Sequence, residues 1–187
     1  MSLPLNLLGI SGSLRKGSFN TGLLRAVREL LPEGIDLDIY SLRQIPPYNF
    51  DMEVAAYPEP VRDFKERIRA ADGLIFATPE YNYSIPGVLK NAVDWASRPP
   101  KENPFNEKPA AIIGASGGPW GTARAQYELR KVCAALNMLL MNRPEILIAN
   151  GEQKFDVDGN LTDQDTRERL RKMVEAFAAW IRRLKVN

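Results

Sequence analysis

Histidine is absent from all 187 residues, and cysteine occurs once, at Cys133. Without histidine, the chain lacks the commonest general base, the usual activator of serine and cysteine nucleophiles, and the commonest transition-metal ligand. A single thiol forms neither an internal disulfide nor a CxxC redox centre. Because Cys133 falls among apolar residues at helical spacing, we interpret it as a core residue. We therefore expect no catalytic side chain and no metal site, and any reactivity should come from an organic cofactor.

Long apolar runs and a strong net charge are also lacking. No stretch approaches the roughly 20 apolar residues that cross a bilayer, and the N-terminus does not resemble a secretory signal. The formal net charge is +2, without a run of Lys or Arg, which disfavours nucleic acid as a partner. We expect a cytoplasmic protein that binds neither membranes nor nucleic acids. A chain of 187 residues is typical of a single domain, which we expect to span residues 1–187.

The chain does contain short apolar runs that alternate regularly with amphipathic segments. This alternation indicates an α/β fold with helices on both faces of a parallel sheet. Five strands fit a flavodoxin-like three-layer sandwich with strand order 2-1-3-4-5. The predicted strands span residues 5–10, 35–40, 73–77, 110–115 and 146–148.

Three local patterns refine this outline. The proline-rich connection over residues 46–60 predicts a loop of about 15 residues. Thr162 and Asp165 have the spacing of a capping box, which predicts the start of the last helix. Residues 156–160 are similar to the start of a calcium loop, but the later ligand positions do not match, so an Asp-Gly turn is predicted.

The loop after the first strand is rich in groups that bind anions. Residues 11–20 read SGSLRKGSFN and precede an amphipathic helix. Serine hydroxyls, an arginine and the free N–H groups of a helix N-terminus together suit a phosphate. The glycines match neither the dinucleotide fingerprint nor a P-loop, so a mononucleotide phosphate fits better. Alternatively, this is an ordinary turn in which Asn20 caps the helix.

Two further loops follow the third and fourth predicted strands. Residues 78–86 read TPEYNYSIP, with prolines that restrict the backbone, and residues 116–118 read SGG, where glycines permit close approach of a ligand. In the order 2-1-3-4-5, strands one, three and four are adjacent, so the three loops should share one crevice. Alternatively, the tyrosines pack on a neighbour and the glycines form a flexible turn.

These motifs resemble those of the NADPH-dependent FMN reductases, and more closely the bacterial quinone and chromate reductases of that family. The resemblance spans residues 5–148. It implies a flavodoxin-like enzyme that binds FMN and uses NADPH or NADH to reduce quinones, oxyanions such as chromate, azo dyes or free flavin. It also implies ping-pong hydride transfer and a homo-oligomer, either a dimer or a tetramer.

Carried over to this chain, the resemblance predicts contacts with FMN from all three loops. The predicted residues are Ser11, Ser13, Leu14, Arg15, Lys16, Ser18, Phe19 and Asn20 in the first loop, Pro79, Glu80, Tyr81, Asn82 and Tyr83 in the second, and Ser116, Gly117 and Gly118 in the third.

Two other function classes stay open. One is a flavodoxin-type electron carrier that does not itself oxidise NAD(P)H, although flavodoxins tend to be acidic and this chain has a net charge of +2. The other is a flavin- or nucleotide-binding regulator without turnover. The sequence does not choose between NADH and NADPH. Asp36 and Asp38 lie near the spacing at which a Rossmann acid binds a ribose, but the glycine pattern that accompanies it is missing.

One more group of polar residues has an interpretation in terms of assembly. Arg124, Tyr127, Glu128 and Glu145 could form a hydrogen-bonded cluster with Tyr83 across a subunit interface. The alternative is a solvated helix face.

Overall fold

A parallel sheet forms the centre of the molecule in the computed structural model, which describes residues 4–185. Its strand order is β2-β1-β3-β4-β5, and β6 also pairs with β4. The strands are β1 (Leu5–Ser11), β2 (Ile35–Tyr40), β3 (Gly73–Ala77), β4 (Pro109–Ala115), β5 (Leu139–Leu140) and β6 (Ile146–Ile148). The predicted flavodoxin-like order 2-1-3-4-5 is confirmed.

The fifth position of the sheet differs from the prediction of a single strand. β5 pairs with the start of β4, where Leu139 lies opposite Pro109, and β6 pairs with its end, where Ile148 lies opposite Ala115. Pro144, in the segment between them, has no N–H to donate to the ladder. The sequence pattern missed β5 because two residues are too few to show a period.

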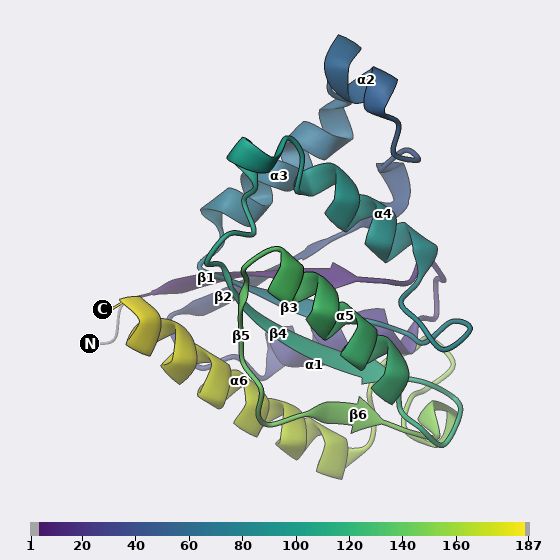
Figure 1. Cartoon of the computed structure of the whole chain (residues 1–187). Helices are drawn as coiled ribbons and strands as arrows, with labels where there is room; N and C mark the ends of the chain where they lie inside the picture. Colours follow the sequence, from purple (N-terminus) through teal and green to yellow (C-terminus); the bar gives the residue numbers. More distant parts are fainter. Residues whose placement is uncertain (1–3, 186–187) are drawn as a thin grey trace.

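Helices cover both faces of the sheet, which confirms the three-layer sandwich (Figure 1). α1 (Phe19–Glu29) and α6 (Gln164–Lys185) pack on one face, and α3 (Glu59–Ala70), α4 (Gly87–Ala96) and α5 (Ala123–Ala135) pack on the other. Each face has its own core because successive strand residues point to opposite sides. Leu7 packs with α1 and α6, and Leu8 packs with the other three helices.

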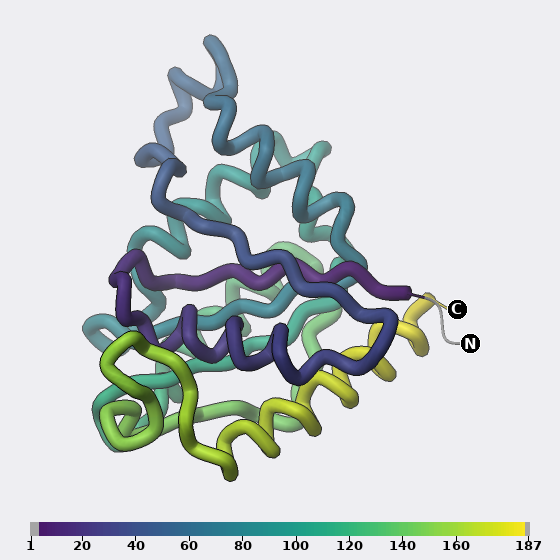
Figure 2. The backbone as a smooth tube through the Cα atoms, turned by 180° about the vertical axis from the view of Figure 1, so that it is seen from behind, coloured from purple at the N-terminus to yellow at the C-terminus, as the bar shows by residue number. Residues whose placement is uncertain are grey.

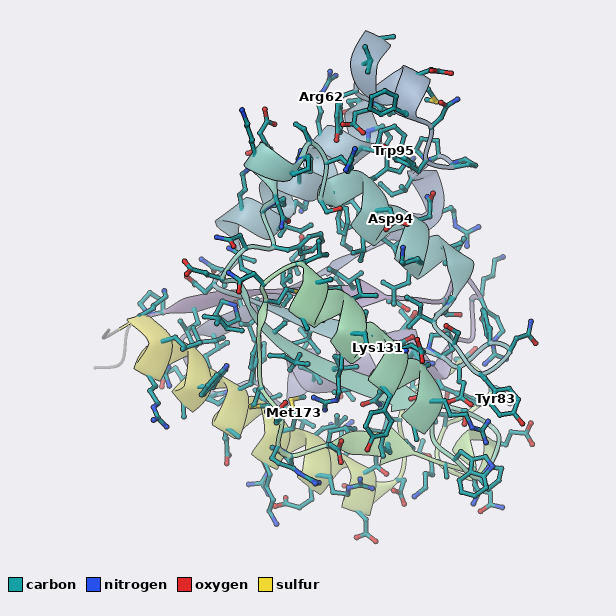
Figure 3. The ribbon with its side chains drawn as sticks, viewed as in Figure 1. Arg62, Tyr83, Asp94, Trp95, Lys131 and Met173 are labelled. Carbon is teal, nitrogen blue, oxygen red and sulfur yellow. The ribbon has the colours of Figure 1, made fainter. Side chains whose placement is uncertain are left out.

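The connection predicted as a long loop contains a helix instead. α2 (Phe50–Ala55) follows a short 3-10 turn, η1 (Leu42–Gln44), and projects beyond the sheet (Figure 1). Asn49 caps α2 by accepting a hydrogen bond from the Asp51 N–H at 2.8 Å. Trp95, on α4, lies below α2 in Figure 3 and packs edge-on against Tyr48. The helix leaves Phe50 and Val54 largely exposed.

Two helix starts differ from the sequence-based expectations. Ser18, not Asn20, caps α1 by accepting a hydrogen bond from the Thr21 N–H. At α6 the predicted pairing of Thr162 with Asp165 is wrong, because Asp163 accepts the Thr166 N–H at 2.9 Å. Thr162 instead bonds to the carbonyl of Lys154 through both its N–H and its hydroxyl. Two further 3-10 turns are η2 (Pro100–Glu102) and η3 (Gly151–Gln153).

The predicted Asp-Gly turn at residues 156–160 is confirmed, and it packs on the start of α1 (Figure 2). Asp156 accepts hydrogen bonds from two N–H groups of the turn, and the bonds from Asn160 lower the pKa of its carboxyl. Gly159 has φ +77° and lies so close to α1 that a Cβ on Gly22 would meet its carbonyl oxygen at 1.9 Å. Arg25 also donates to that oxygen, at 2.9 Å.

Neither a metal-binding cluster nor a membrane-spanning helix is found in the part of the chain that the structure describes. No group of three or more His, Cys, Asp or Glu residues within 4–185 is arranged to hold a metal ion. None of the helices described is long and apolar enough to cross a membrane. Cys133 is fully buried, and burial raises the pKa of its thiol to about 12.

Replacing Gly22 by alanine should destabilise the fold by about 2 kcal/mol, because the new methyl group collides with backbone and not with a flexible side chain. Urea unfolding measures the change. Gly87→Ala is the matched control, since a Cβ there meets nothing within 4 Å and should change stability by less than about 1 kcal/mol. Equal effects of the two substitutions would contradict the close packing of the turn on α1.

The Cys133 thiol should not react with an aromatic disulfide reagent at pH 8 while the protein is folded. A pKa near 12 leaves about one thiol in ten thousand as the reactive thiolate at this pH. Unfolding in guanidinium should release one equivalent of reactive thiol. The absorbance of the released aromatic thiol measures the reaction. Rapid labelling of the native protein would contradict the burial of Cys133.

Candidate cofactor-binding site

Three loops meet at the carboxyl end of the sheet and enclose one cleft of about 300 Å³. They follow β1, β3 and β4, which are adjacent in the sheet. The convergence expected from the strand order is therefore present. The lining residues are Ser13, Arg15, Ser18, Phe19, Asn20, Pro79, Glu80, Tyr81, Ala115, Ser116 and Gly117.

The first loop presents the N-terminus of α1 to the cleft. Arg15 lies with its guanidinium 5.0 Å from the centre of the Phe19 ring, which in turn stacks on Phe155 at 4.8 Å. Ser18, at the cap of α1, lines the same cleft. Free N–H groups at a helix N-terminus, hydroxyls and a guanidinium form the donor set that binds phosphate groups. Arg15 is thus held at the place where a phosphate would sit.

Asn20 connects the first loop to the third. Its side chain is 3% exposed, and its amide forms two hydrogen bonds of 2.9 Å with the backbone of Ala115, one donated by Nδ2 and one accepted by Oδ1. Ala115 is the last residue of β4. The amide therefore fixes the start of α1 against the end of β4, and each loop keeps its place because of the other.

The second loop ends in a tight turn. Tyr81 and Ser84 exchange two backbone hydrogen bonds of 3.0 Å, and the residues between them, Asn82 and Tyr83, have φ of 49° and 67°. Left-handed conformations at both central positions match the turn that the right-handed twist of a hairpin favours. Besides the prolines, this hydrogen-bonded turn restricts the conformation of the second loop. In Figure 3, Tyr83 extends from this turn at the edge of the molecule, where 68% of it is exposed.

Glu80 joins the second loop to α5. Its Oε2 accepts hydrogen bonds from the backbone N–H groups of Arg124 at 2.9 Å and Ala125 at 3.2 Å, and its Oε1 accepts from the Arg124 guanidinium at 2.9 Å. Thr122, at the N-cap of α5, provides no side-chain cap. A carboxylate from a distant loop therefore caps this helix and complements the positive end of its dipole.

Arg124 also holds the turn of the second loop in place. Its guanidinium lies 3.9 Å from the centre of the Tyr83 ring and 5.5 Å from that of Trp120. A left-handed tyrosine costs about 1–2 kcal/mol, and contact of its ring with a cation offsets part of that cost.

The cluster predicted around Arg124 divides into separate contacts within the described chain. Glu128 pairs with Lys131 at 2.7 Å, and Glu145 pairs with Arg130 at 3.5 Å and Arg143 at 2.9 Å. Tyr127 is 64% exposed. Arg124 packs on Tyr83 and has Glu80, which was not among the predicted members, as its carboxylate partner. A role for these residues between subunits stays a prediction.

Glycines leave open space over the third loop. A Cβ on Gly117 would meet only Glu152 Oε1 at 3.8 Å, and one on Gly118 only Ser116 Oγ at 4.0 Å. Packing within the protein therefore does not require glycine here. The backbone itself is well held, since the Ser116 N–H donates to Ile148 at 3.0 Å and its carbonyl accepts from Gly151 at 2.9 Å. The space beside these two glycines permits the close approach of a ligand to this fixed backbone.

Some predicted residues lie outside this cleft. Ser11, Leu14 and Lys16 line a neighbouring cleft on the other side of the first loop, and Ser11 hydrogen-bonds Thr21 at 2.8 Å. The lining of the first cleft also omits Asn82, Tyr83 and Gly118. It includes Ala115, which the sequence analysis missed because an alanine carries no chemical signal. Its place at the end of a predicted strand was the one available clue.

The donor set of this cleft fits FMN. The first loop provides phosphate-binding groups at a helix N-terminus, and the second and third loops provide fixed backbone beside open space. A flavin mononucleotide combines a terminal phosphate with a flat ring that has a polar edge. The two halves of the cleft match these two parts.

Comparisons with known proteins agree with this geometry. The sequence model of the NADPH-dependent FMN reductases matches residues 5–153. The chain belongs to the NADPH-dependent FMN reductase family. The resemblance inferred from the loop motifs is confirmed. Among relatives of this FMN reductase family protein, an NAD(P)H-dependent FMN reductase of Pseudomonas aeruginosa is 50% identical, over 99% of this chain and 100% of its own.

Two further relatives extend the comparison. A 2-hydroxy-1,4-benzoquinone reductase of a Burkholderia species is 46% identical, over 96% of this chain and 98% of its own. The solved structure of FerB, an NAD(P)H:acceptor oxidoreductase of Paracoccus denitrificans, superposes with a TM-score of 0.87 at 37% identity and covers 96% of this chain and 98% of that one. The fold of this FMN reductase family protein therefore matches that of a solved flavoenzyme.

Replacing Glu80 by alanine should lower the free energy of unfolding by about 2 kcal/mol, because α5 loses its cap and Arg124 its carboxylate. Glu80→Gln should fall between this variant and the wild type, since its amide oxygen still accepts a hydrogen bond. Glu66→Ala is the control: its side chain is 68% exposed, and its ion-pair partner among residues 4–185 is Arg69 on the same helix, so a change below about 0.5 kcal/mol is expected. Unfolding in guanidinium measures the free energy of unfolding of the three variants and the wild type. An unchanged free energy in Glu80→Ala would contradict the capping role.

Proposed function

We propose that this protein is an FMN-dependent NAD(P)H oxidoreductase that transfers two electrons from NADPH or NADH to quinones. The observation that carries the proposal is the meeting of three loops at one cleft, with phosphate-binding groups on one side and open backbone on the other. Membership of the FMN reductase family supports it. So does the relative named as a 2-hydroxy-1,4-benzoquinone reductase.

The chain's residues bind and orient in this proposal. Ser13, Ser18 and Arg15 hold the phosphate together with the first N–H groups of α1. The second loop, from Pro79 to Tyr83, and the third loop, from Ser116 to Gly118, hold the two edges of the flavin ring. When bound, FMN supplies the hydride acceptance and electron donation that no side chain of this cleft provides.

No lining residue is assigned as an acid or base. Glu80 is the one carboxylate of the lining, and both of its oxygens accept hydrogen bonds from α5 or Arg124. We therefore assign this residue to positioning. The cleft has one open mouth in this proposal, so the nicotinamide and the electron acceptor occupy it in turn, which corresponds to a ping-pong mechanism.

The proposal extends to acceptors and assembly. An open mouth also admits oxyanions such as chromate, azo dyes and free flavin. We propose a single cytoplasmic domain that forms dimers or tetramers and binds neither nucleic acid nor membranes; residues 1–3 and 186–187 of that domain lie outside the described residues. The short helix α2 exposes Phe50, Met52 and Val54, and this group of apolar side chains on one element supports assembly, because exposed apolar patches mark interfaces.

Reduction of the purified protein tests the function directly. It should carry a yellow flavin chromophore that NADPH bleaches without any other protein, and adding a quinone should cause sustained loss of NADPH. A flavodoxin-type carrier, the second candidate, would bleach only with a separate reductase. A protein that stays colourless and does not bind added FMN would contradict both functions.

Arg15→Ala should weaken FMN binding at least tenfold, because a charged hydrogen bond to phosphate contributes about 1.5–3 kcal/mol. Quenching of FMN fluorescence by the apoprotein measures the dissociation constant. Lys101→Ala removes an exposed cation from η2, which precedes the start of β4, whereas the third loop follows the end of that strand; this variant serves as the control. Equal dissociation constants for the two variants would argue against the phosphate site at Arg15.

A further inference from the structure

A second cleft lies beside the first, on the other side of the loop after β1. It has a volume of about 290 Å³ and opens between this loop and the segment that follows β2. Ser13 and Arg15 line both clefts, so the two adjoin. The remaining lining residues are Ser11, Leu14, Lys16, Thr21, Ile39, Tyr40, Ser41, Leu42 and Arg43.

The second cleft is basic and has no acidic counterpart. Arg15, Lys16 and Arg43 line it, whereas the lining provided by residues 4–185 includes no Asp or Glu. Within the same residues, none of these three cations forms an ion pair with a carboxylate. In the proposed function Arg15 binds the FMN phosphate, so Lys16 and Arg43 are the cations that belong to the second cleft alone. Two cations without a carboxylate, next to several hydroxyls, suit a phosphate dianion.

Backbone contacts hold the two walls together. Arg43 Nη2 donates to the carbonyl of Leu14 at 2.7 Å, which links the segment after β2 to the first loop. The guanidinium has five N–H donors, so this bond leaves others for an anion. Ser41 caps η1 and accepts the Arg43 N–H, and Leu42 anchors the turn with 2% of its surface exposed. The basic groups thus lie on a fixed frame.

The position of the cleft indicates which phosphate it would bind. In Rossmann folds, whose glycine fingerprint this chain lacks, a carboxylate near the end of the second strand binds a free 2′-hydroxyl of the adenosine ribose, and an arginine nearby accommodates a 2′-phosphate. Here Asp38 lies inside β2 and pairs with Arg67 at 2.6 Å. Ser41 and Arg43 follow the strand instead. This arrangement favours a phosphorylated ribose.

We infer that the second cleft binds the 2′-phosphate of NADPH, while the nicotinamide end of the same molecule reaches the FMN cleft. This inference rests on the proposed NAD(P)H oxidoreductase function. The loops after β4 and β2 are three strand spacings apart, roughly 14 Å, which an extended dinucleotide can bridge. The cleft then selects NADPH over NADH.

Calorimetric titration of the FMN-bound protein with adenosine 2′,5′-bisphosphate and with adenosine 5′-monophosphate tests the site without any turnover. The bisphosphate should bind at least tenfold more tightly, since the two nucleotides differ only in the 2′-phosphate. Arg43→Ala should abolish this difference in affinity between the two nucleotides, and Ser41→Ala, which deletes one hydroxyl, should reduce the difference. Arg28→Ala removes an exposed cation at the other end of α1 and should keep it.

Steady-state kinetics provides the second measurement. The ratio of kcat/KM for NADPH to that for NADH should fall about tenfold in Arg43→Ala. The flavin spectrum and the thermal midpoint establish that each variant is folded and carries FMN. If Arg43→Ala fails to fold or to bind FMN, the comparison of Ser41→Ala with the wild type tests the inference instead.

The outcomes separate this inference from the proposed function. Equal binding of the two nucleotides by the wild type would overturn the inference even if NADPH reduces the protein. A difference in affinity between the two nucleotides that persists in both Arg43→Ala and Ser41→Ala would also overturn it. The same holds if inorganic phosphate, at the concentration of the bisphosphate, abolishes this difference. If neither nicotinamide nucleotide is oxidised, the proposed function fails, while the titration still decides whether the cleft binds a 2′-phosphate.

Discussion

The buried amide of Asn20 is the contact on which the candidate site depends most. A parallel sheet places the ends of β1, β3 and β4 in a row, but strand order alone does not fix the loops beyond those ends. Asn20 forms two hydrogen bonds with the backbone of Ala115 and thereby links the first loop to the third. Because an unsatisfied buried amide or backbone group is costly, each of the two segments holds the other in place.

The second loop is fixed by the same kind of cross-connection. Glu80 caps a helix that begins more than forty residues later, and Arg124 of that helix packs on Tyr83. The three loops are therefore parts of one hydrogen-bonded frame and not three independent turns. A rigid frame of backbone suits a protein without histidine, because its contribution to redox chemistry is to hold and orient a cofactor.

The loop after β1 has a different environment on each of its sides. On one side, the N-terminus of α1 and residues Ser116 and Gly117 of the third loop line a cleft that fits FMN. On the other, the segment after β2 brings Ser41 and Arg43 beside Lys16. A single loop thus serves two adjoining clefts, and Arg15 lines both. In the proposed function, this loop lies between the cofactor and the far end of its electron donor.

The sequence by itself determined the α/β class and the composition of the three loops, because apolar periodicity and loop composition are local properties. The strand order followed from the match of five strands to the flavodoxin-like topology, and from that order the meeting of the loops. The sequence also located most of the residues that line the cleft. Only the tertiary structure decided that α2 occupies the proline-rich connection, that β5 and β6 divide the fifth position, and that Asp163 caps α6. It also decided that Glu80 caps α5 and that, within the described chain, Glu128 and Glu145 pair with residues other than Arg124. The partners in these contacts come from distant segments or compete for the same group, and no local pattern records which acceptor will be nearest once the chain has folded.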